Sequence, residues 1–94
     1  MIDAAARPRL ASKAKLRLDK KTGQQVLLYP EKGLLLNPTG AAILALCDGE
    51  RTVRQIAEGL RASYTQAPIE ALERDVQAFL GSLAERGLLD GIGS

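Results

Sequence analysis

The sequence predicts an α+β domain in which a three-stranded antiparallel sheet is followed by three helices. Residues 15–36 hold short apolar runs separated by turn residues, the pattern of strands. Residues 38–86 carry apolar residues at helical spacing, with capping residues before the runs. Strands that precede helices are typical of α+β domains. Two short helices before a long one also resemble a winged helix-turn-helix arrangement.

Size and composition indicate a single small domain. The 94 residues are 46% hydrophobic, too apolar for a disordered chain, but they include only two Tyr and one Phe. Aliphatic side chains must therefore fill the core. We expect residues 1–13 to form a flexible basic arm, because they show no sustained period, and residues 14–90 to form the domain. Residues 91–94 are expected to be a frayed end.

The strands come first. Residues 15–19 alternate polar and apolar side chains, as a half-buried strand does, and residues 25–29 (QVLLY) form a second strand. Gly23 suits the turn between them, which makes the pair an antiparallel hairpin. Residues 30–33 are expected to break the ladder, so the third strand is predicted over residues 34–36.

Capping residues place the three helices. Asn37 is a preferred N-cap and Pro38 a preferred first helical residue, so the first helix is predicted from Pro38 to about Cys47. Thr52 and Gln55 form a capping box for the second helix. The third helix is predicted from Pro68 to Gly87, with a buried apolar stripe. Its apolar residues are Ile69, Leu72, Val76, Phe79, Leu80 and Leu83.

The residues that catalysis and metal binding require are missing. The chain has no His and a single Cys, so the commonest general base, the commonest metal ligand and an internal disulfide are excluded. Cys47 lies on an apolar helix and is predicted to be a core residue. The sequence therefore favours a protein that is not an enzyme and needs no cofactor. With no secretory signal and no transmembrane run, it is expected in the cytoplasm.

Charge is unevenly distributed. Residues 1–32 carry eight Lys or Arg against three acidic residues, whereas residues 33–94 carry five Arg against eight acidic residues. The third helix holds two Arg and four acidic residues, so it would repel a phosphate backbone. A winged-helix DNA-binding protein is the alternative function, and the charge of this helix disfavours it.

A short last strand leaves an open sheet edge, where an extended peptide could add as another strand. Leu34, Leu35 and Leu36 alternate faces, so either Leu35 or the other two must point away from the core, unless a helix covers both faces. A second copy of the chain could also pair through this edge, which makes a homodimer possible.

A series of short motifs along the chain has a specific order and spacing. The motifs are Arg7-Pro8-Arg9-Leu10, Leu16-Arg17-Leu18-Asp19, Leu28-Tyr29-Pro30-Glu31, Leu36-Asn37, Ala42-Ile43-Leu44-Ala45-Leu46-Cys47-Asp48-Gly49, Thr52-Val53, Ile56, Leu60, Asp75-Val76, Phe79-Leu80, Leu83 and Gly87-Leu88-Leu89. Together, over about residues 7–90, they resemble the PqqD family, the small accessory proteins of pyrroloquinoline quinone (PQQ) biosynthesis.

This resemblance implies a winged-helix-like RiPP recognition element, which binds ribosomally made precursor peptides. The chain would bind the precursor peptide PqqA as an extra strand and present it to PqqE, a radical S-adenosylmethionine enzyme that holds its own iron–sulfur clusters. The implied peptide-binding residues lie on the third strand and the third helix. They are Gly33, Leu34, Leu35, Leu36, Asn37, Asp75, Val76, Phe79 and Leu83.

Overall fold

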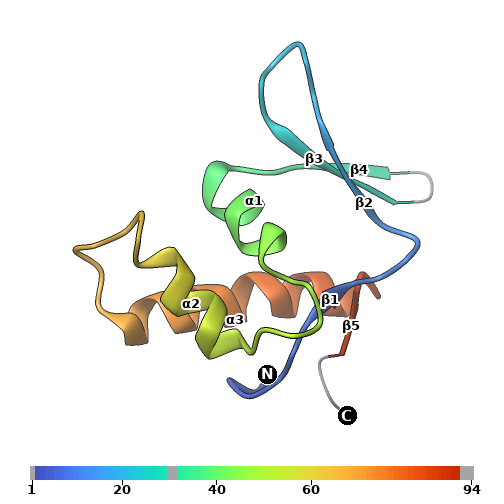
Figure 1. The fold of residues 1–94 in the computed structure, drawn as a ribbon. Helices are drawn as coiled ribbons and strands as arrows, with labels where there is room; N and C mark the ends of the chain where they lie inside the picture. The colour runs from blue at the N-terminus through green and yellow to red at the C-terminus, as the bar shows by residue number, and fades with distance from the viewer. Residues whose placement is uncertain (1, 30–31, 92–94) are drawn as a thin grey trace.

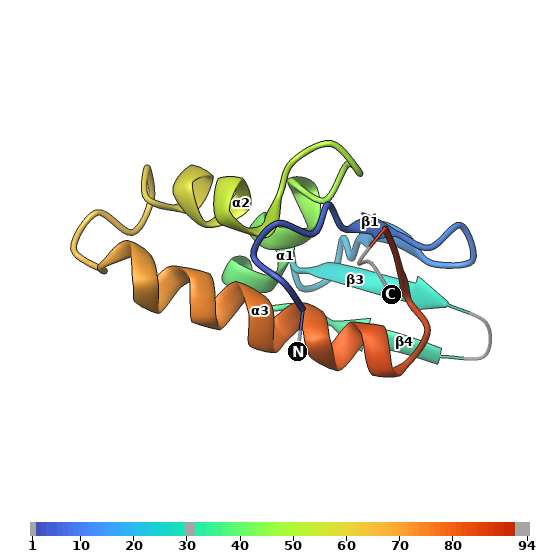
Figure 2. The same ribbon diagram turned by 90° about the horizontal axis from the view of Figure 1, so that it is seen from below.

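The computed structural model describes residues 2–29 and 32–91, and within them a sheet packs against three helices (Figures 1 and 2). The α+β prediction is confirmed. The sheet has the order β2-β3-β4 and is antiparallel. A separate two-stranded pair joins the two ends of the chain. The elements are β1 (Arg9–Leu10), β2 (Lys15–Leu18), β3 (Gln25–Tyr29), β4 (Lys32–Leu35), α1 (Pro38–Ala45), α2 (Val53–Leu60), α3 (Ile69–Glu85) and β5 (Leu89–Asp90).

The register of the sheet sorts its side chains onto two faces. Leu27 pairs with Leu16 on β2 and with Leu34 on β4, so these three share one face. Leu27 is fully buried, which makes this the inner face, packed toward the helices. Val26 pairs with Leu35 on the opposite, outer face. In Figure 2, α3 runs along the sheet with β4 as the neighbouring strand.

The third predicted strand lies in the right place with shifted ends. It begins at Lys32, two residues earlier than expected, and ends at Leu35. Gly33 does not break the ladder, because it pairs with Leu28. The N–H of Leu36 still donates to the carbonyl of Gln25, just beyond the strand. The other expected turn residues, 30 and 31, lie outside the described residues.

The caps confirm the starts of the first two helices. The Asn37 side chain accepts a hydrogen bond of 2.7 Å from the N–H of Gly40, at the start of α1. Thr52 and Gln55 form both hydrogen bonds of the capping box. Two helix limits differ from the prediction. Helix α1 ends at Ala45 rather than near residue 47, and Pro68 is the N-cap of α3 rather than its first residue.

The N-terminal segment corrects the predicted domain boundary, because residues 2–11 pack into the domain instead of forming an arm. The side chains of Ile2 and Pro8 are buried. The carbonyls of Ala6 and Pro8 accept hydrogen bonds from the N–H groups of Val53 and Gly49. The first N–H groups of a helix have no partner within that helix, and this segment supplies the missing acceptor for α2. Residues 92–94 lie outside the described residues.

The core lies between the inner face of the sheet and the helices. As predicted, Cys47 is a buried core residue, and its thiol donates to the carbonyl of Ile43 at 3.3 Å. Gly87 has a φ of +72°, which ends α3 and turns Leu88 and Leu89 back into the core. Within the described residues, none of the helices has the length and apolar character needed to cross a membrane.

Candidate functional site

Strand β4 is an outer strand of the sheet, and its backbone presents unpaired groups along one side. In an antiparallel ladder, residues alternate between pointing their N–H and C=O groups at the neighbouring strand and pointing them away. The N–H of Leu36 points at β3, since it donates to Gln25. Leu34 therefore points the same way, and the groups of Gly33 and Leu35 point outward. Among the described residues, no backbone hydrogen bond reaches these outward groups.

The three leucines at positions 34–36 lie on the two faces of the sheet. Leu36 is buried, with 3% of its surface exposed, and Leu34 is half-buried on the same inner face. Leu35 is 55% exposed. The expectation that one of the leucines points away from the core is therefore confirmed for Leu35, and a helix that covers both faces is ruled out.

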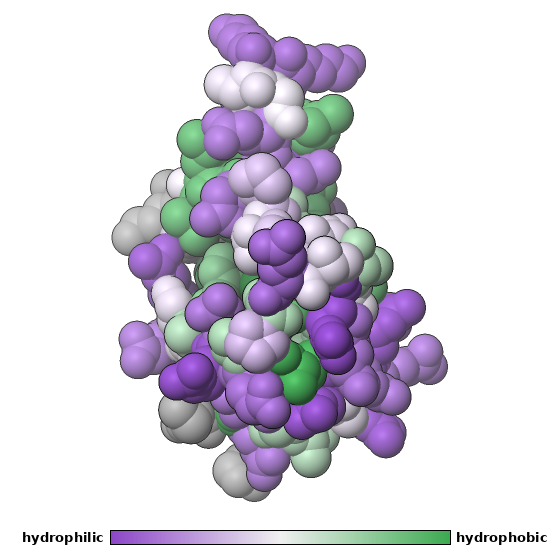
Figure 3. Space-filling view, turned by 90° about the vertical axis from the view of Figure 1, so that its left-hand side faces the viewer, coloured by the Kyte–Doolittle hydropathy of each residue, from purple (hydrophilic) through white to green (hydrophobic). Residues whose placement is uncertain are grey.

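Leu35 belongs to an apolar area on the outer face. Val26 and Leu28 are half-buried beside it, and Gly33 of β4, opposite Leu28, has no side chain to cover them. A Cβ atom at position 33 would lie 3.4 Å from Leu28 Cδ2 and 3.5 Å from Val26 Cγ1, in van der Waals contact with both. Because glycine has no Cβ atom, the Leu28 and Val26 side chains are not covered by a side chain at position 33. Figure 3 shows hydrophobic side chains gathered on the sheet below the hydrophilic tip of the β2–β3 hairpin.

The second element of the candidate site is one flank of α3. Phe79 is half-buried, and its ring lies against Gly40 of α1, where a Cβ atom would be only 3.1 Å from two ring carbons. Asp75 is exposed on the same flank, one turn earlier. Val76 and Leu83, which the family resemblance also implies, are 0% and 1% exposed, so they belong to the core beneath this flank.

The opposite flank of α3 is already occupied within the domain. Arg54 of α2 forms an ion pair of 3.1 Å with Glu73, and Gln77 donates to the carbonyl of Ile2 at 2.7 Å. The flank that carries Phe79 therefore faces away from α2 and the N-terminal segment, and its contact is with Gly40 of α1.

Two contacts set the relative direction of β4 and α3. Arg86 Nη1 lies 3.5 Å from the hydroxyl of Tyr29, the residue that pairs with Lys32 at the start of β4. Phe79 lies against Gly40, shortly after the end of β4. The start of β4 is therefore close to the end of α3, and the two elements run in opposite directions.

Among the described residues, Cys47 and Asp48 have pKa values that depart clearly from the ordinary ones. Burial, and to a lesser extent the nearby charge of Asp48, raises the pKa of the Cys47 thiol to about 12, so it is protonated and unreactive near neutral pH. The Asp48 carboxylate accepts hydrogen bonds from the N–H groups of Arg51 and Glu50, which lower its pKa. These two hydrogen bonds hold the turn that follows Asp48. No group of three potential metal ligands occurs in the part of the chain that the structure describes.

One known protein family shares the sequence pattern of most of this fold. The model of the family described as coenzyme PQQ synthesis protein D (PqqD) matches residues 24–89, which include β3, β4 and all three helices. The chain belongs to the PqqD family. The resemblance inferred from the sequence motifs is thereby confirmed.

Curated PqqD relatives match most of the chain. The PqqA binding protein of Bradyrhizobium diazoefficiens is 40% identical over 88 residues, covering 94% of this chain and 84% of that protein. The bifunctional coenzyme PQQ synthesis protein C/D of Methylorubrum extorquens is 37% identical over 83 residues. That match covers 88% of this chain but only 22% of the relative, so in that protein the PqqD-like part is joined to a much longer chain.

Solved structures share the fold. The PqqD truncation of Methylobacterium extorquens PqqCD, described as a stand-alone RiPP recognition element, has a TM-score of 0.83 and 34% identity, covering 96% of this chain and 95% of that one. Lasso peptide synthetase B1, solved with its leader peptide, has a TM-score of 0.75 and 26% identity, covering 90% of this chain and 99% of that one.

Sequence reasoning missed part of the surroundings of β4. It did not single out Val26 and Leu28, which border Leu35 on the outer face, or Arg86, which marks the end of α3 near Tyr29. The alternation of Val26 and Leu28 within QVLLY carried the signal for the outer face. The contact of Arg86 had no local signal, because it depends on how α3 packs on the sheet.

Proposed function

We propose that this chain is a noncatalytic chaperone that binds the peptide PqqA as an added strand along the free edge of β4. The observation that carries the proposal is the open edge itself. The N–H and C=O groups of Gly33 and Leu35 point outward, and the exposed Leu35 side chain lies beside them. Strand addition satisfies such groups and supplies affinity independent of the peptide's side chains.

An added strand would present its side chains alternately to two surfaces. One row would face inward, toward Leu34 and the Phe79 flank of α3. The other row would lie on the outer face beside Leu35 and, more distantly, Val26. Pockets for alternate side chains on the two sides of one strand would fix the register of the peptide.

The remaining residues implied by the family resemblance take supporting roles in this proposal. Val76 and Leu83 are buried and would hold α3 at its distance from β4. Asn37 caps α1 through its side chain and so fixes where the edge ends. Asp75 is exposed and would meet a cationic or hydrogen-bonding group of the peptide.

Relatives support a peptide as the ligand. Proteins at about 40% identity are named PqqA binding proteins, and the lasso peptide synthetase relative was solved with a leader peptide. We further propose that the chain acts in the cytoplasm and presents PqqA to the radical S-adenosylmethionine enzyme PqqE. The enzyme would supply the catalytic chemistry and its own iron–sulfur clusters. A homodimer through β4 would compete with the peptide for the same edge.

A titration of fluorescently labelled PqqA tests the proposal. We expect saturable binding, which a scrambled peptide of the same composition does not reproduce, at both low and high salt. Random duplex DNA serves as the comparison ligand. Salt-sensitive DNA binding without PqqA binding would refute the chaperone proposal and favour the alternative of a DNA-binding protein. Repeating the titration at two protein concentrations reveals competition from a homodimer.

Proline substitutions locate the peptide on the sheet. Gly33→Pro removes an outward N–H of β4 and leaves the β3–β4 ladder intact, since Pro is tolerated where the N–H faces away from the neighbouring strand. We expect PqqA affinity to fall by at least about ten-fold, from a lost hydrogen bond and the bulk of the ring. Leu18→Pro is the matched control. The N–H of Leu18 points away from β3, at the β2 edge of the sheet, because the N–H of the next residue, Asp19, donates to the carbonyl of Gln24.

A further inference from the structure

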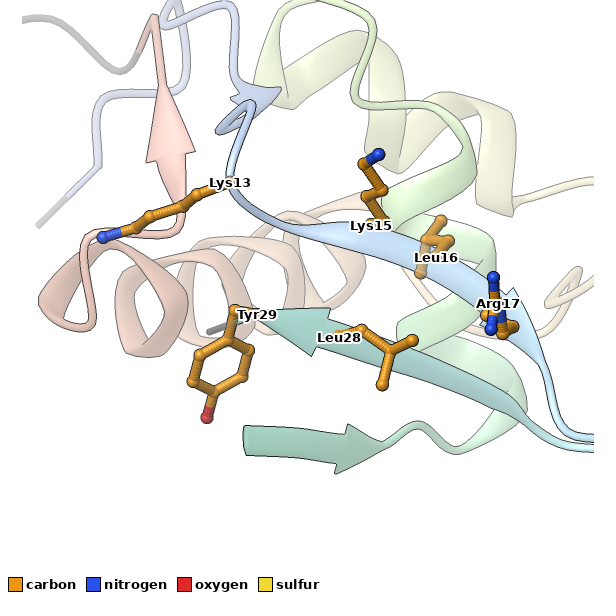
Figure 4. Close-up of a pocket in the computed structure, with 6 residues that line it drawn as sticks. All are labelled: Lys13, Lys15, Leu16, Arg17, Leu28 and Tyr29. Carbon is orange, nitrogen blue, oxygen red and sulfur yellow. The ribbon is translucent and has the colours of Figure 1, made fainter. Parts of the chain in front are cut away.

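The edge of the sheet opposite to β4 carries a surface hollow, and Leu28 of β3 is the one residue that it shares with the apolar area around Leu35. The hollow has a volume of about 260 Å³ and lies along β2 and the end of β3, at the edge of the sheet opposite to β4. Figure 4 shows its residues, which come from β2, from the segment just before it and from β3. They are Lys13, Lys15, Leu16, Arg17, Leu28 and Tyr29.

The charge of this basic hollow is uncompensated. Three of its six lining residues are cations and none is acidic. The ion pairs found among the described side chains join Arg9 to Asp90, Arg51 to Asp48 and Arg54 to Glu73, so none involves Lys13, Lys15 or Arg17. Three neighbouring positive charges attract carboxylates and raise the rate at which an acidic partner associates.

The same hollow also exposes apolar surface. Leu16 is 36% exposed, although it shares the inner face with the fully buried Leu27, and Leu28 and Tyr29 are half-buried. An inorganic anion gains nothing from leucine side chains. A protein surface that combines carboxylates with an apolar side chain matches both parts of the hollow, and such combinations are typical of protein–protein interfaces.

We propose that the basic hollow docks a second protein through an acidic, apolar-flanked surface, and that this protein is the enzyme that receives the peptide. The inference rests on the proposed function, because a peptide chaperone must contact its enzyme while the peptide is bound. The hollow and the β4 edge lie at opposite edges of the sheet, with β3 between β2 and β4. Both can therefore be occupied at once. Nucleic acid fits less well, because its phosphates gain nothing from the exposed leucine side chains of the hollow.

A pair of matched double variants tests this docking surface, with purified PqqE as the probe. Lys15→Glu with Arg17→Glu reverses two charges of the hollow. Lys20→Glu with Lys21→Glu makes the same change of net charge at the exposed hairpin tip, outside the hollow. We expect the first variant to bind PqqE at least about ten-fold more weakly and the second to bind within about two-fold of the unchanged chain. Circular dichroism checks that both are folded.

The apolar part of the hollow has its own comparison. Leu16→Ala should weaken PqqE binding by a few-fold, whereas Leu18→Ala, on the same strand and outside the hollow, should not. Equal losses in the two double variants would assign the effect to general charge and overturn the proposal. The proposal would also be overturned if duplex DNA competed with PqqE for the chain, or if the unchanged chain did not bind PqqE.

PqqA affinity separates failure of this inference from failure of the proposed function. Both double variants should bind labelled PqqA as the unchanged chain does, because none of the four residues lies on β4 or α3. If the chain binds PqqA normally and the two variants bind PqqE equally, only the docking surface is wrong. If the unchanged chain does not bind PqqA, the proposed function fails by itself.

Discussion

Replacing Leu35 by Ala is the sharpest test of where the peptide binds. Leu35 is the most exposed large hydrophobic residue among the described residues and lies on β4, beside the outward N–H and C=O groups of its own backbone. Its side chain should become covered when a strand is added next to it. Removing most of that side chain should therefore weaken peptide binding while the sheet stays intact.

The size of the effect follows from the exposed fraction. Full burial of a leucine side chain stabilises by about 1.5–3 kcal/mol. Leu35 has 55% of its surface left to bury, which gives about 0.8–1.7 kcal/mol as the most that peptide binding can gain from it. This corresponds to a rise in the dissociation constant of roughly 4- to 16-fold. Because Ala retains the Cβ atom, the lower half of that range is expected.

The assay is a fluorescence anisotropy titration of labelled PqqA, with Leu18→Ala as the matched control. Leu18 is the same residue type, is 53% exposed, and lies on β2 at the other edge of the sheet. Since the two leucines are equally exposed, their substitutions should lower the free energy of unfolding by similar amounts. Any difference in peptide affinity then reports the location of the peptide.

Two results would refute the reasoning. An unchanged affinity of Leu35→Ala would mean that the peptide does not cover the outer side of β4. A loss in Leu18→Ala equal to that in Leu35→Ala would mean that the peptide adds at β2, or that both substitutions act through stability. Urea denaturation of the two variants distinguishes the last two cases.

Three further predictions concern the scaffold. Thr52→Ala removes the hydroxyl of the capping box and should lower the free energy of unfolding by about 1 kcal/mol in urea denaturation. Leu27→Ala leaves a cavity beneath the central strand, where the leucine side chain is fully buried. It should lower the free energy of unfolding by about 2–5 kcal/mol. The Cys47 thiol, whose pKa is raised to about 12, should react with iodoacetamide at pH 8 about 1,000-fold more slowly in the folded chain than in urea. Because its pKa is higher in the folded state, its contribution to stability is complete below its ordinary pKa of 9.0 and is lost as pH rises toward 12.

These predictions have simple controls. Thr65→Ala changes an exposed threonine in the loop before α3 and should leave the free energy of unfolding nearly unchanged. A loss as large as that of Thr52→Ala would contradict the role of the cap. Rapid alkylation of Cys47 in the folded chain would show that the thiol is accessible, against its 7% exposure. The unfolding free energy of Cys47→Ala, measured from pH 8 to 11, isolates the thiol contribution.

Local patterns in the sequence determined most of the elements. The QVLLY run, the Asn37-Pro38 pair and the Thr52–Gln55 capping box each act through hydrogen bonds or side-chain alternation within a few residues. Their positions could therefore be predicted without knowing what packs against them. The same local alternation required that Leu35 and Leu34 lie on opposite faces, and the shortness of the last predicted strand indicated an open sheet edge.

Tertiary structure decided which face of the sheet packs on the helices and which elements lie beside the free edge of β4. Leu35 is exposed because Leu27, opposite Leu34, is the residue that packs on the helices, and that choice depends on register across strands. The N-terminal segment joins the domain because its carbonyls meet the unpaired N–H groups of α2, more than 40 residues later in the chain. Neither contact has a local signal, since both depend on groups brought together only when the chain has folded. The nearness of the end of α3 to the start of β4 arises in the same way.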